Sequence, residues 1–133
     1  MTEFTRFEIY MLLNQQKPLW LAGIDLTGAE LDSASLSGAN LARAILTEAV
    51  LSNADLTGAY LGLADLTGAK LYYANLKGAD LRFTNLTGAD LRFAHLTGAN
   101  LTGANLTGAI LSDAIMTGAD LRGATMSDGT VHS

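Results

Sequence analysis

Leucine recurs at every fifth position through most of the chain. The series runs from Leu21 to Leu121, and Met116, Met126 and Val131 complete it, while alanine stands two residues earlier at nearly every step. A five-residue step turns by about 140° around an α-helix, so these leucines would not share one helix face. In a straight strand, successive leucines would point to opposite faces. The pattern therefore predicts a chain that turns a corner in each repeat and winds around a central column of leucine and alanine.

A second, ten-residue period lies on top of the five-residue one. Threonine or serine followed by glycine begins at Thr27, Ser37, Thr57, Thr67, Thr87, Thr97, Thr107 and Thr117. A three-sided coil of about 15 residues would spread these pairs around the rod, whereas a four-sided coil of about 20 stacks them on two opposite sides. The sequence therefore predicts four sides, with roughly six coils in a rod about 30 Å long.

The second residue after most of the leucines is glycine, which predicts tight turns of type II with a positive φ at that residue. In other repeats the same slot holds a residue with a side chain, namely Arg43, Leu63, Tyr73, Phe83 or Phe93. We expect a turn that tolerates a side chain there, so that opposite sides of the rod differ in turn type. Thr84 replaces an inward alanine, and its hydroxyl needs a partner in the interior.

Residues 1–18 lie outside the repeat. Phe4, Phe7, Met11 and Leu12 fall at helical spacing, Thr2 can serve as N-cap, and the pair Lys17-Pro18 stops a helix. The chain is therefore expected to divide into a capping helix over 1–18 and a repeat domain over 19–133. Stacked repeats need a cap over their open apolar end, which gives the helix its role.

Composition narrows the class of protein. The chain has 133 residues, no cysteine and a formal net charge of −5, with the excess acidity in residues 1–66. This balance argues against a general nucleic-acid binder, which neutralises phosphates with lysine and arginine. The absence of cysteine fits a reducing compartment, and neither a leader peptide nor an apolar run of membrane-spanning length is evident. We expect a soluble, cytoplasmic protein.

The repeat resembles that of the pentapeptide-repeat proteins, whose motif is A-[D/N]-L-x-x. Typical copies are Ala54-Asp55-Leu56-Thr57-Gly58 and Ala99-Asn100-Leu101-Thr102-Gly103, and the resemblance covers 19–131. It implies an all-β fold, a right-handed quadrilateral parallel β-helix, in a bacterial protein. The handedness comes from the resemblance, because periodicity alone does not show it.

No constellation of residues points to catalysis. His95 and His132 are the only histidines, fall in different columns of the repeat, and lack a nucleophile or a metal-ligand set around them. The sequence contains no phosphate-binding loop of the G-x-x-x-x-G-K-[ST] type. We therefore predict no enzymatic activity, no cofactor, no metal site and no direct contact with nucleic acid or membrane.

Aromatic and large apolar residues gather in the middle coils. Leu63 is expected to stack on Phe83, and Tyr73 on Phe93, with Tyr60, Tyr72 and Arg92 close by. These columns either stiffen neighbouring coils or form a patch that binds a partner. The candidate partner surface comprises Tyr60, Leu63, Tyr72, Tyr73, Phe83, Arg92 and Phe93.

The leading hypothesis is a non-catalytic interaction, scaffold or regulatory module that presents a rigid acidic rod to a protein partner. The resemblance implies an alternative, a DNA mimic that binds a type II topoisomerase such as gyrase. It also implies kinship with short regulatory members of the family in photosynthetic bacteria. After Met126 the repeat decays with no capping helix, and some relatives dimerise through this end, so a homodimer through the C-terminal end is expected.

Overall fold

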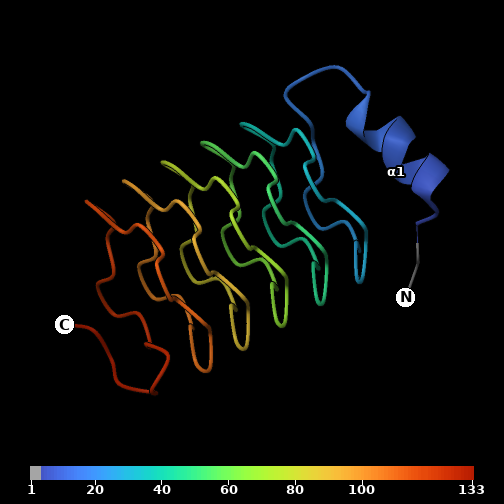
Figure 1. Cartoon of the computed structure of the whole chain (residues 1–133). Helices are drawn as coiled ribbons and strands as arrows, with labels where there is room; N and C mark the ends of the chain where they lie inside the picture. The colour runs from blue at the N-terminus through green and yellow to red at the C-terminus, as the bar shows by residue number, and fades with distance from the viewer. Residues whose placement is uncertain (1–3) are drawn as a thin grey trace.

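The computed structural model describes residues 4–133 as one helix followed by a stack of coils (Figure 1). The coils follow one another along a single axis. Helix α1 lies at one end of the stack and the C-terminus lies at the other.

Each coil has four sides. Parallel β-bridges join a residue to the one 20 positions later, from Trp20↔Asn40 to Asn105↔Thr125. Because each repeat has five residues, four repeats complete one coil, as the ten-residue alternation predicts. Every bridge is one residue long, and residues 4–133 contain no longer strand. The right-handed sense of the winding stays a prediction.

We name each of the four faces after one of its bridged residues. The Tyr60 face comprises Trp20, Asn40, Tyr60, Asp80, Asn100 and Asp120, and it is followed along the chain by the Asp65, Lys70 and Asn75 faces. Two corners matter below. The Leu63 corner, between the Tyr60 and Asp65 faces, carries Arg43, Leu63 and Phe83. The Tyr73 corner, between the Lys70 and Asn75 faces, carries Tyr72, Tyr73, Arg92 and Phe93.

Backbone hydrogen bonds join every coil to the next. The N–H of Tyr60 donates to the carbonyl of Ala39 at 2.9 Å, and the N–H of Leu61 donates to Asp80 at 2.8 Å. The repeat's aspartate or asparagine accepts a further bond from the N–H two residues later, as Asp55 Oδ1 does from Thr57 at 3.1 Å. These short polar side chains are preferred in turns because they bond to the backbone in this way.

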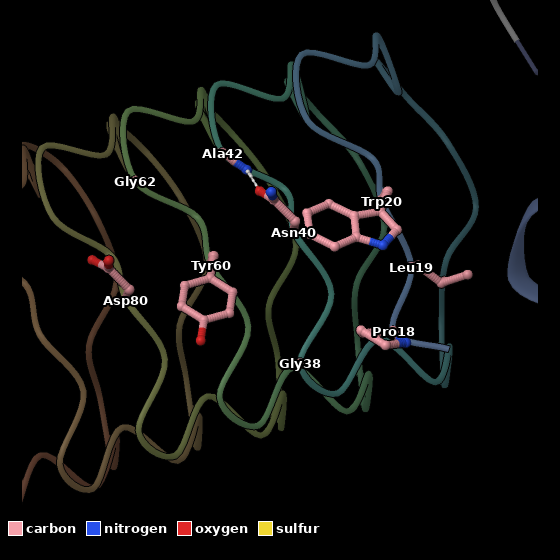
Figure 2. Close-up of a pocket in the computed structure, with 9 residues that line it drawn as sticks. All are labelled: Pro18, Leu19, Trp20, Gly38, Asn40, Ala42, Tyr60, Gly62 and Asp80. Atoms are coloured by element: carbon pink, nitrogen blue, oxygen red, sulfur yellow. Dashed lines mark hydrogen bonds between the residues drawn. The ribbon is translucent and has the colours of Figure 1, made fainter. Parts of the chain in front are cut away.

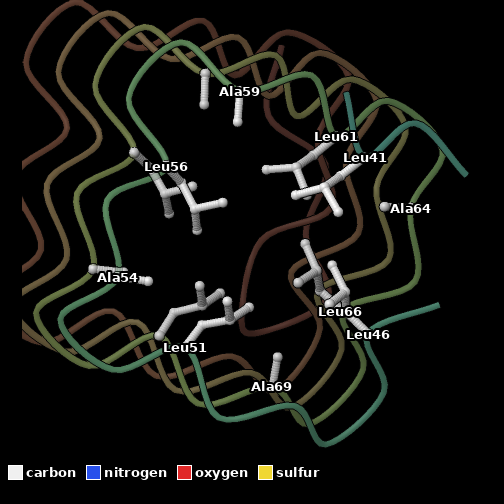
Figure 3. Close-up of a cluster of buried hydrophobic side chains, with 14 of the residues drawn as sticks. Leu41, Leu46, Leu51, Ala54, Leu56, Ala59, Leu61, Ala64, Leu66 and Ala69 are labelled. Atoms are coloured by element: carbon white, nitrogen blue, oxygen red, sulfur yellow. The ribbon is translucent and has the colours of Figure 1, made fainter. Parts of the chain in front are cut away.

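Leucine and alanine side chains point inward from all four sides (Figure 3). Leucines of the series from Leu36 to Leu106 are at most 1% exposed, and most of the intervening alanines are fully buried. Thr84 is 1% exposed, and its hydroxyl donates to the carbonyl of Leu81 at 2.8 Å. The polar group that the sequence places in the interior therefore has the partner it requires.

All corners use one kind of turn, so the expectation that opposite sides differ in turn type is wrong. Arg43, Leu63, Tyr73, Phe83 and Phe93 adopt φ between 57° and 62°, close to the 63–72° of the turn glycines from Gly23 to Gly123. The N–H of Leu63 donates to the backbone carbonyl of Arg82 in the next coil at 3.0 Å. The N–H of Ala64 donates to the carbonyl of Leu61 at 3.0 Å, which closes the turn. Keeping these bonds outweighs the roughly 1–2 kcal/mol that a left-handed backbone costs a residue with a Cβ.

Arg43→Gly is expected to raise the free energy of unfolding by about 0.5–1 kcal/mol, because glycine has no Cβ to clash at positive φ. Arg43 is exposed and has φ of 60°, so little packing is lost. The measurement is equilibrium unfolding in guanidinium chloride. Ala42→Gly is the matched control, since this neighbour has no positive φ and should lose stability instead. Equal effects at both positions would contradict the turn assignment.

Helix α1 spans Arg6–Leu13 and is shorter than the predicted helix over 1–18. Its N-cap is Thr5, whose hydroxyl accepts from the N–H of Glu8 at 3.1 Å while the Glu8 carboxylate accepts from Thr5 N at 3.1 Å. Thr2, the predicted N-cap, lies outside the described residues. Ile9 is buried against the first coil, and Arg6 forms a 2.6 Å ion pair with Glu30.

The last residues fold back on the final coil. Val131 forms an antiparallel bridge with Thr125, and the N–H of His132 donates to Ala124 at 2.8 Å. Val131 is 68% exposed, so its predicted place in the interior series is wrong. Side chains of the series in this coil, including Leu111, Met116 and Leu121, are only partly buried.

Candidate interaction surfaces

The Tyr73 corner holds a compact aromatic cluster. Tyr73 stacks on Phe93, with ring centroids 4.9 Å apart and planes 13° from parallel, as their positions in adjacent coils predict. Tyr72 meets both rings edge-on, at 4.6 Å from Tyr73 and 5.7 Å from Phe93. The Arg92 guanidinium lies 5.2 Å from the centre of the Tyr72 ring, in cation–π contact. The side chains of this cluster thus pack on one another.

The Leu63 corner is more open. Leu63 is 51% exposed and Phe83 59%, and the nearby Tyr60 on the adjoining face is 57% exposed. The Phe83 ring lies over the next coil, because a Cβ added to Gly103 would come within 2.5 Å of its edge carbons. No ring contact joins Phe83 to another aromatic side chain in residues 4–133. This corner therefore offers apolar surface that the rod itself leaves uncovered.

The seven predicted surface residues do not form one patch. Leu63 and Tyr73 are half a coil apart along the chain, so their corners are diagonally opposite on the rod. Tyr60 lies on the side of the Leu63 corner, whereas Tyr72 and Arg92 lie on the side of the Tyr73 corner. Tyr72 and Arg92 lie beside the Tyr73 and Phe93 column as expected, and Tyr60 lies on the face that adjoins the other column.

A shallow groove runs along the Tyr60 face beside the Leu63 corner (Figure 2). It encloses about 570 Å³ and is lined by Pro18, Leu19, Trp20, Gly38, Asn40, Ala42, Tyr60, Gly62 and Asp80. Figure 2 shows the rings of Trp20 and Tyr60 lying broadside along the face, with Asn40 between them. Trp20 is 76% exposed. Sequence reasoning missed Trp20, although the repeat places it on the same face as Tyr60, two coils away.

Three aspartates are paired with an arginine two residues later. The shortest N–O distances are 2.8 Å for Asp80–Arg82, 2.7 Å for Asp90–Arg92 and 2.6 Å for Asp120–Arg122. Hydrogen bonds from these guanidinium groups hold the pKa of all three carboxyl groups below its ordinary value. A two-residue spacing along the chain brings each guanidinium group to its carboxylate, and this local pairing reduces the negative surface of the later coils.

Asp120 is expected to titrate at a pKa of about 2, below its ordinary value of 3.8, because Arg122 donates to it from both side chain and backbone. A carboxyl whose pKa is lower in the folded chain adds stability above its ordinary pKa, and this is lost as the pH falls through about 2. Carbonyl NMR shifts of Asp120 measure the titration. Arg122→Gln should return its pKa towards the ordinary value, and an unchanged pKa in this variant would contradict the assignment.

Two kinds of site are not found in the described part of the chain. Residues 4–133 contain no group of three or more histidine, aspartate or glutamate side chains arranged to hold a metal ion. The same residues include no helix long and apolar enough to cross a bilayer.

Comparison with known proteins decides the family. Eight copies of the pentapeptide repeat match the sequence, over residues 24–62, 44–88 and 89–128. The chain belongs to the pentapeptide-repeat family. The resemblance drawn from the A-[D/N]-L-x-x motif is thereby confirmed, and with it the β-helix class of the fold.

Solved structures of other pentapeptide-repeat proteins are similar to this chain. HetL, a protein from the cyanobacterium Nostoc sp. strain PCC 7120 involved in heterocyst differentiation regulation, is 38% identical with a TM-score of 0.65, over 86% of this chain and 66% of HetL. Rfr23 from the cyanobacterium Cyanothece 51142 is 32% identical with a TM-score of 0.48, over 90% of this chain and 68% of Rfr23. A protein of the Arabidopsis thaliana thylakoid lumen is 28% identical with a TM-score of 0.39, over 85% of this chain and 68% of its own.

The chain thus spans about two thirds of the length of HetL. A search of curated proteins found no match.

Proposed function

We propose that this pentapeptide-repeat protein is a non-catalytic interaction module, a scaffold or regulator that presents a rigid rod to a protein partner. The observation that carries the proposal is the strained placement of Leu63 and Phe83. Both hold a left-handed backbone, with φ of 62° and 57°, yet their side chains are half exposed. Bulky residues are rare in this conformation, and it costs of order 1–3 kcal/mol at such sites. The turn's hydrogen bonds hold this backbone in place, but burial against the rod does not explain why a bulky side chain stands where the repeat commonly has glycine.

Contact with a partner would explain these side chains. Exposed aromatic and aliphatic side chains that become buried on association supply most of the binding energy of protein interfaces. The Leu63 corner and the adjoining Tyr60 together offer such side chains on one edge of the rod. The Tyr73 corner is the weaker candidate, because its rings already pack on one another, which favours the stiffening role for that column.

Affinity capture with the rod as bait tests the proposal. The double variant Leu63→Gly/Phe83→Gly restores the residue that the repeat commonly holds in this slot, so the rod should stay folded. We expect the wild-type rod to retain a partner protein, and this variant to retain about ten-fold less of it or lower still, as when an interface hot spot is removed. The matched control is Tyr73→Gly/Phe93→Gly, which should still retain it. Equal capture by wild type and the Leu63 corner variant, with both folded, would overturn the assignment.

A DNA mimic that binds gyrase is the alternative. A mimic needs a long negative surface, and the arginine partners of Asp80, Asp90 and Asp120 interrupt it in the later coils. If micromolar concentrations of the rod inhibit or protect gyrase in a supercoiling assay, the result would favour the DNA mimic over the interaction module.

Two further expectations belong to this proposal. A cytoplasmic location is supported by the absence of cysteine, which fits a reducing compartment. A homodimer through the final coil is supported by the partial burial of Leu111, Met116 and Leu121. Light scattering at high concentration should give twice the mass of one chain, and the monomer mass would contradict the dimer.

A further inference from the structure

The groove on the Tyr60 face has a regular composition. Along the face, Trp20, Asn40, Tyr60 and Asp80 alternate aromatic and polar side chains, one per coil. Asn40 and Asp80 keep the hydrogen bond typical of the repeat, accepting from the N–H groups of Ala42 and Arg82 at 3.1 Å. Trp20 and Tyr60 cannot accept this bond through their rings. At Trp20 and Tyr60 an exposed ring therefore stands where the repeat usually forms this local hydrogen bond.

The spacing of the two rings selects a partner conformation. Neighbouring strands lie about 4.8 Å apart, so the backbones of Trp20 and Tyr60, two coils apart, are separated by about 10 Å. A polyproline II helix rises about 3.1 Å per residue and repeats every three residues, which gives about 9 Å per turn. Residues three apart on such a helix would therefore meet the two rings in turn. Proline-rich segments dock in aromatic-lined grooves of this kind.

Hydrogen-bond donors in the groove match the same ligand. The carbonyl groups of a polyproline II helix make no internal hydrogen bonds and are free to accept. The Asn40 side-chain oxygen is used by Ala42, which leaves its amide NH₂ to donate. The indole N–H of Trp20 and the hydroxyl of Tyr60 have no partner in residues 4–133. Three donors therefore follow the groove in successive coils.

Charged side chains beside the groove indicate the charge that a ligand should carry. Asp80 is neutralised by both Nε and Nη2 of Arg82, at 2.9 and 2.8 Å. Arg43, at the Leu63 corner, and Lys77, three residues before Asp80 at the other edge of the face, form no ion pair within residues 4–133. Two uncompensated cations thus flank a neutral groove. An acidic ligand complements them.

We infer that the Trp20–Tyr60 groove binds a proline-rich segment of a partner protein in the polyproline II conformation, with carboxylate side chains beside its prolines. This inference rests on the proposed function and names the chemistry of the partner. A neutral oligosaccharide could also stack on the two rings, but it would leave Arg43 and Lys77 without a role.

Trp20 is the only tryptophan of the chain, so its fluorescence reports on the groove directly. The probe is a synthetic peptide with proline at every third position and glutamate among the residues between. We expect it to shift and saturate the emission of the full chain. A peptide with alanine in place of proline, and one with lysine in place of glutamate, should each bind about ten-fold more weakly or worse.

Variants locate the binding. Tyr60→Ala should weaken peptide binding by about ten-fold, as loss of an aromatic anchor does, and Phe93→Gly on the opposite corner should leave it within about two-fold. Circular dichroism checks that both variants are folded. Arg43→Gln should weaken binding and reduce its dependence on salt, a change that a purely apolar contact would not show.

Three results would overturn the inference: no emission change with the proline–glutamate peptide, equal binding of the alanine peptide, or saturation by a β-linked glucose hexamer instead. If one of these results occurs but affinity capture of a partner still depends on Leu63 and Phe83, the proposed function holds and only the groove inference fails. Failure of both the peptide and the capture experiments would overturn the two together.

Discussion

Leu81→Ala is expected to lower the free energy of unfolding by about 2–5 kcal/mol. Leu81 lies in the middle of the rod, is fully buried, and belongs to the column of leucines that fills the interior. Truncation to alanine removes the transfer free energy of the buried side-chain atoms and leaves a cavity. The cavity cannot collapse, because hydrogen bonds hold the neighbouring coils at a fixed spacing. Equilibrium unfolding in guanidinium chloride measures the loss.

The matched control for this prediction is Leu63→Ala. It deletes the same atoms from a side chain that is 51% exposed, and the expected change is within about 0.5 kcal/mol, as for other surface substitutions. Losses of equal size at Leu81 and Leu63 would contradict the assignment of one leucine to the interior and the other to the corner.

Ala89→Leu is expected to destabilise the rod by about 1–3 kcal/mol, although it adds apolar surface. Ala89 is fully buried, and the columns of small residues between the leucines allow the four sides to close. A larger side chain would have to push the coil open or adopt an unfavourable rotamer. Thermal unfolding followed by circular dichroism measures the effect.

Ala119→Leu is the control, because Ala119 lies in the final coil and is only partly buried. The added side chain can extend towards solvent there, so the change should be smaller than at Ala89. A stabilised Ala89→Leu variant would show that the interior has room that the structure does not give it.

The architecture of the rod could be read from the sequence because one short pattern repeats. The five-residue step excludes helix and straight strand, and the alternation of the Thr-Gly and Ser-Gly pairs selects a four-sided coil. These arguments need only geometry, and the parallel bridges agree with them, because each joins a residue to its equivalent four repeats later.

Turn geometry was harder to predict because local and long-range preferences conflict there. Leu63 and Phe83 disfavour a positive φ, but each turn also supplies an N–H to the next coil, as Leu63 does to Arg82. The ladder imposes one geometry on all corners. At the N-terminus the decisive signal was present in the sequence, because Thr5 and Glu8 have the three-residue spacing of a capping box.

The candidate surface could be predicted only in part. Pairs that lie one coil apart, such as Tyr73 and Phe93, follow directly from the four-sided coil. Trp20 and Tyr60 are two coils apart, and they line one groove because the side chains between them are small. Stacking of residues in adjacent coils does not predict such a groove. The separation of the Leu63 and Tyr73 corners also needs the four sides placed in space.

The four-sided coil underlies every surface described above, and engineered disulfides test it most directly in this cysteine-free chain. Thr87→Cys/Thr107→Cys places two cysteines on adjacent coils, where strands about 4.8 Å apart suit a disulfide. Thr87→Cys/Thr102→Cys places them on different corners. We predict that mild oxidation of the folded chains, read out by mass and thiol labelling, links the 87/107 pair and leaves the 87/102 pair reduced. A disulfide in the 87/102 pair, with the 87/107 thiols free, would contradict the four-sided coil.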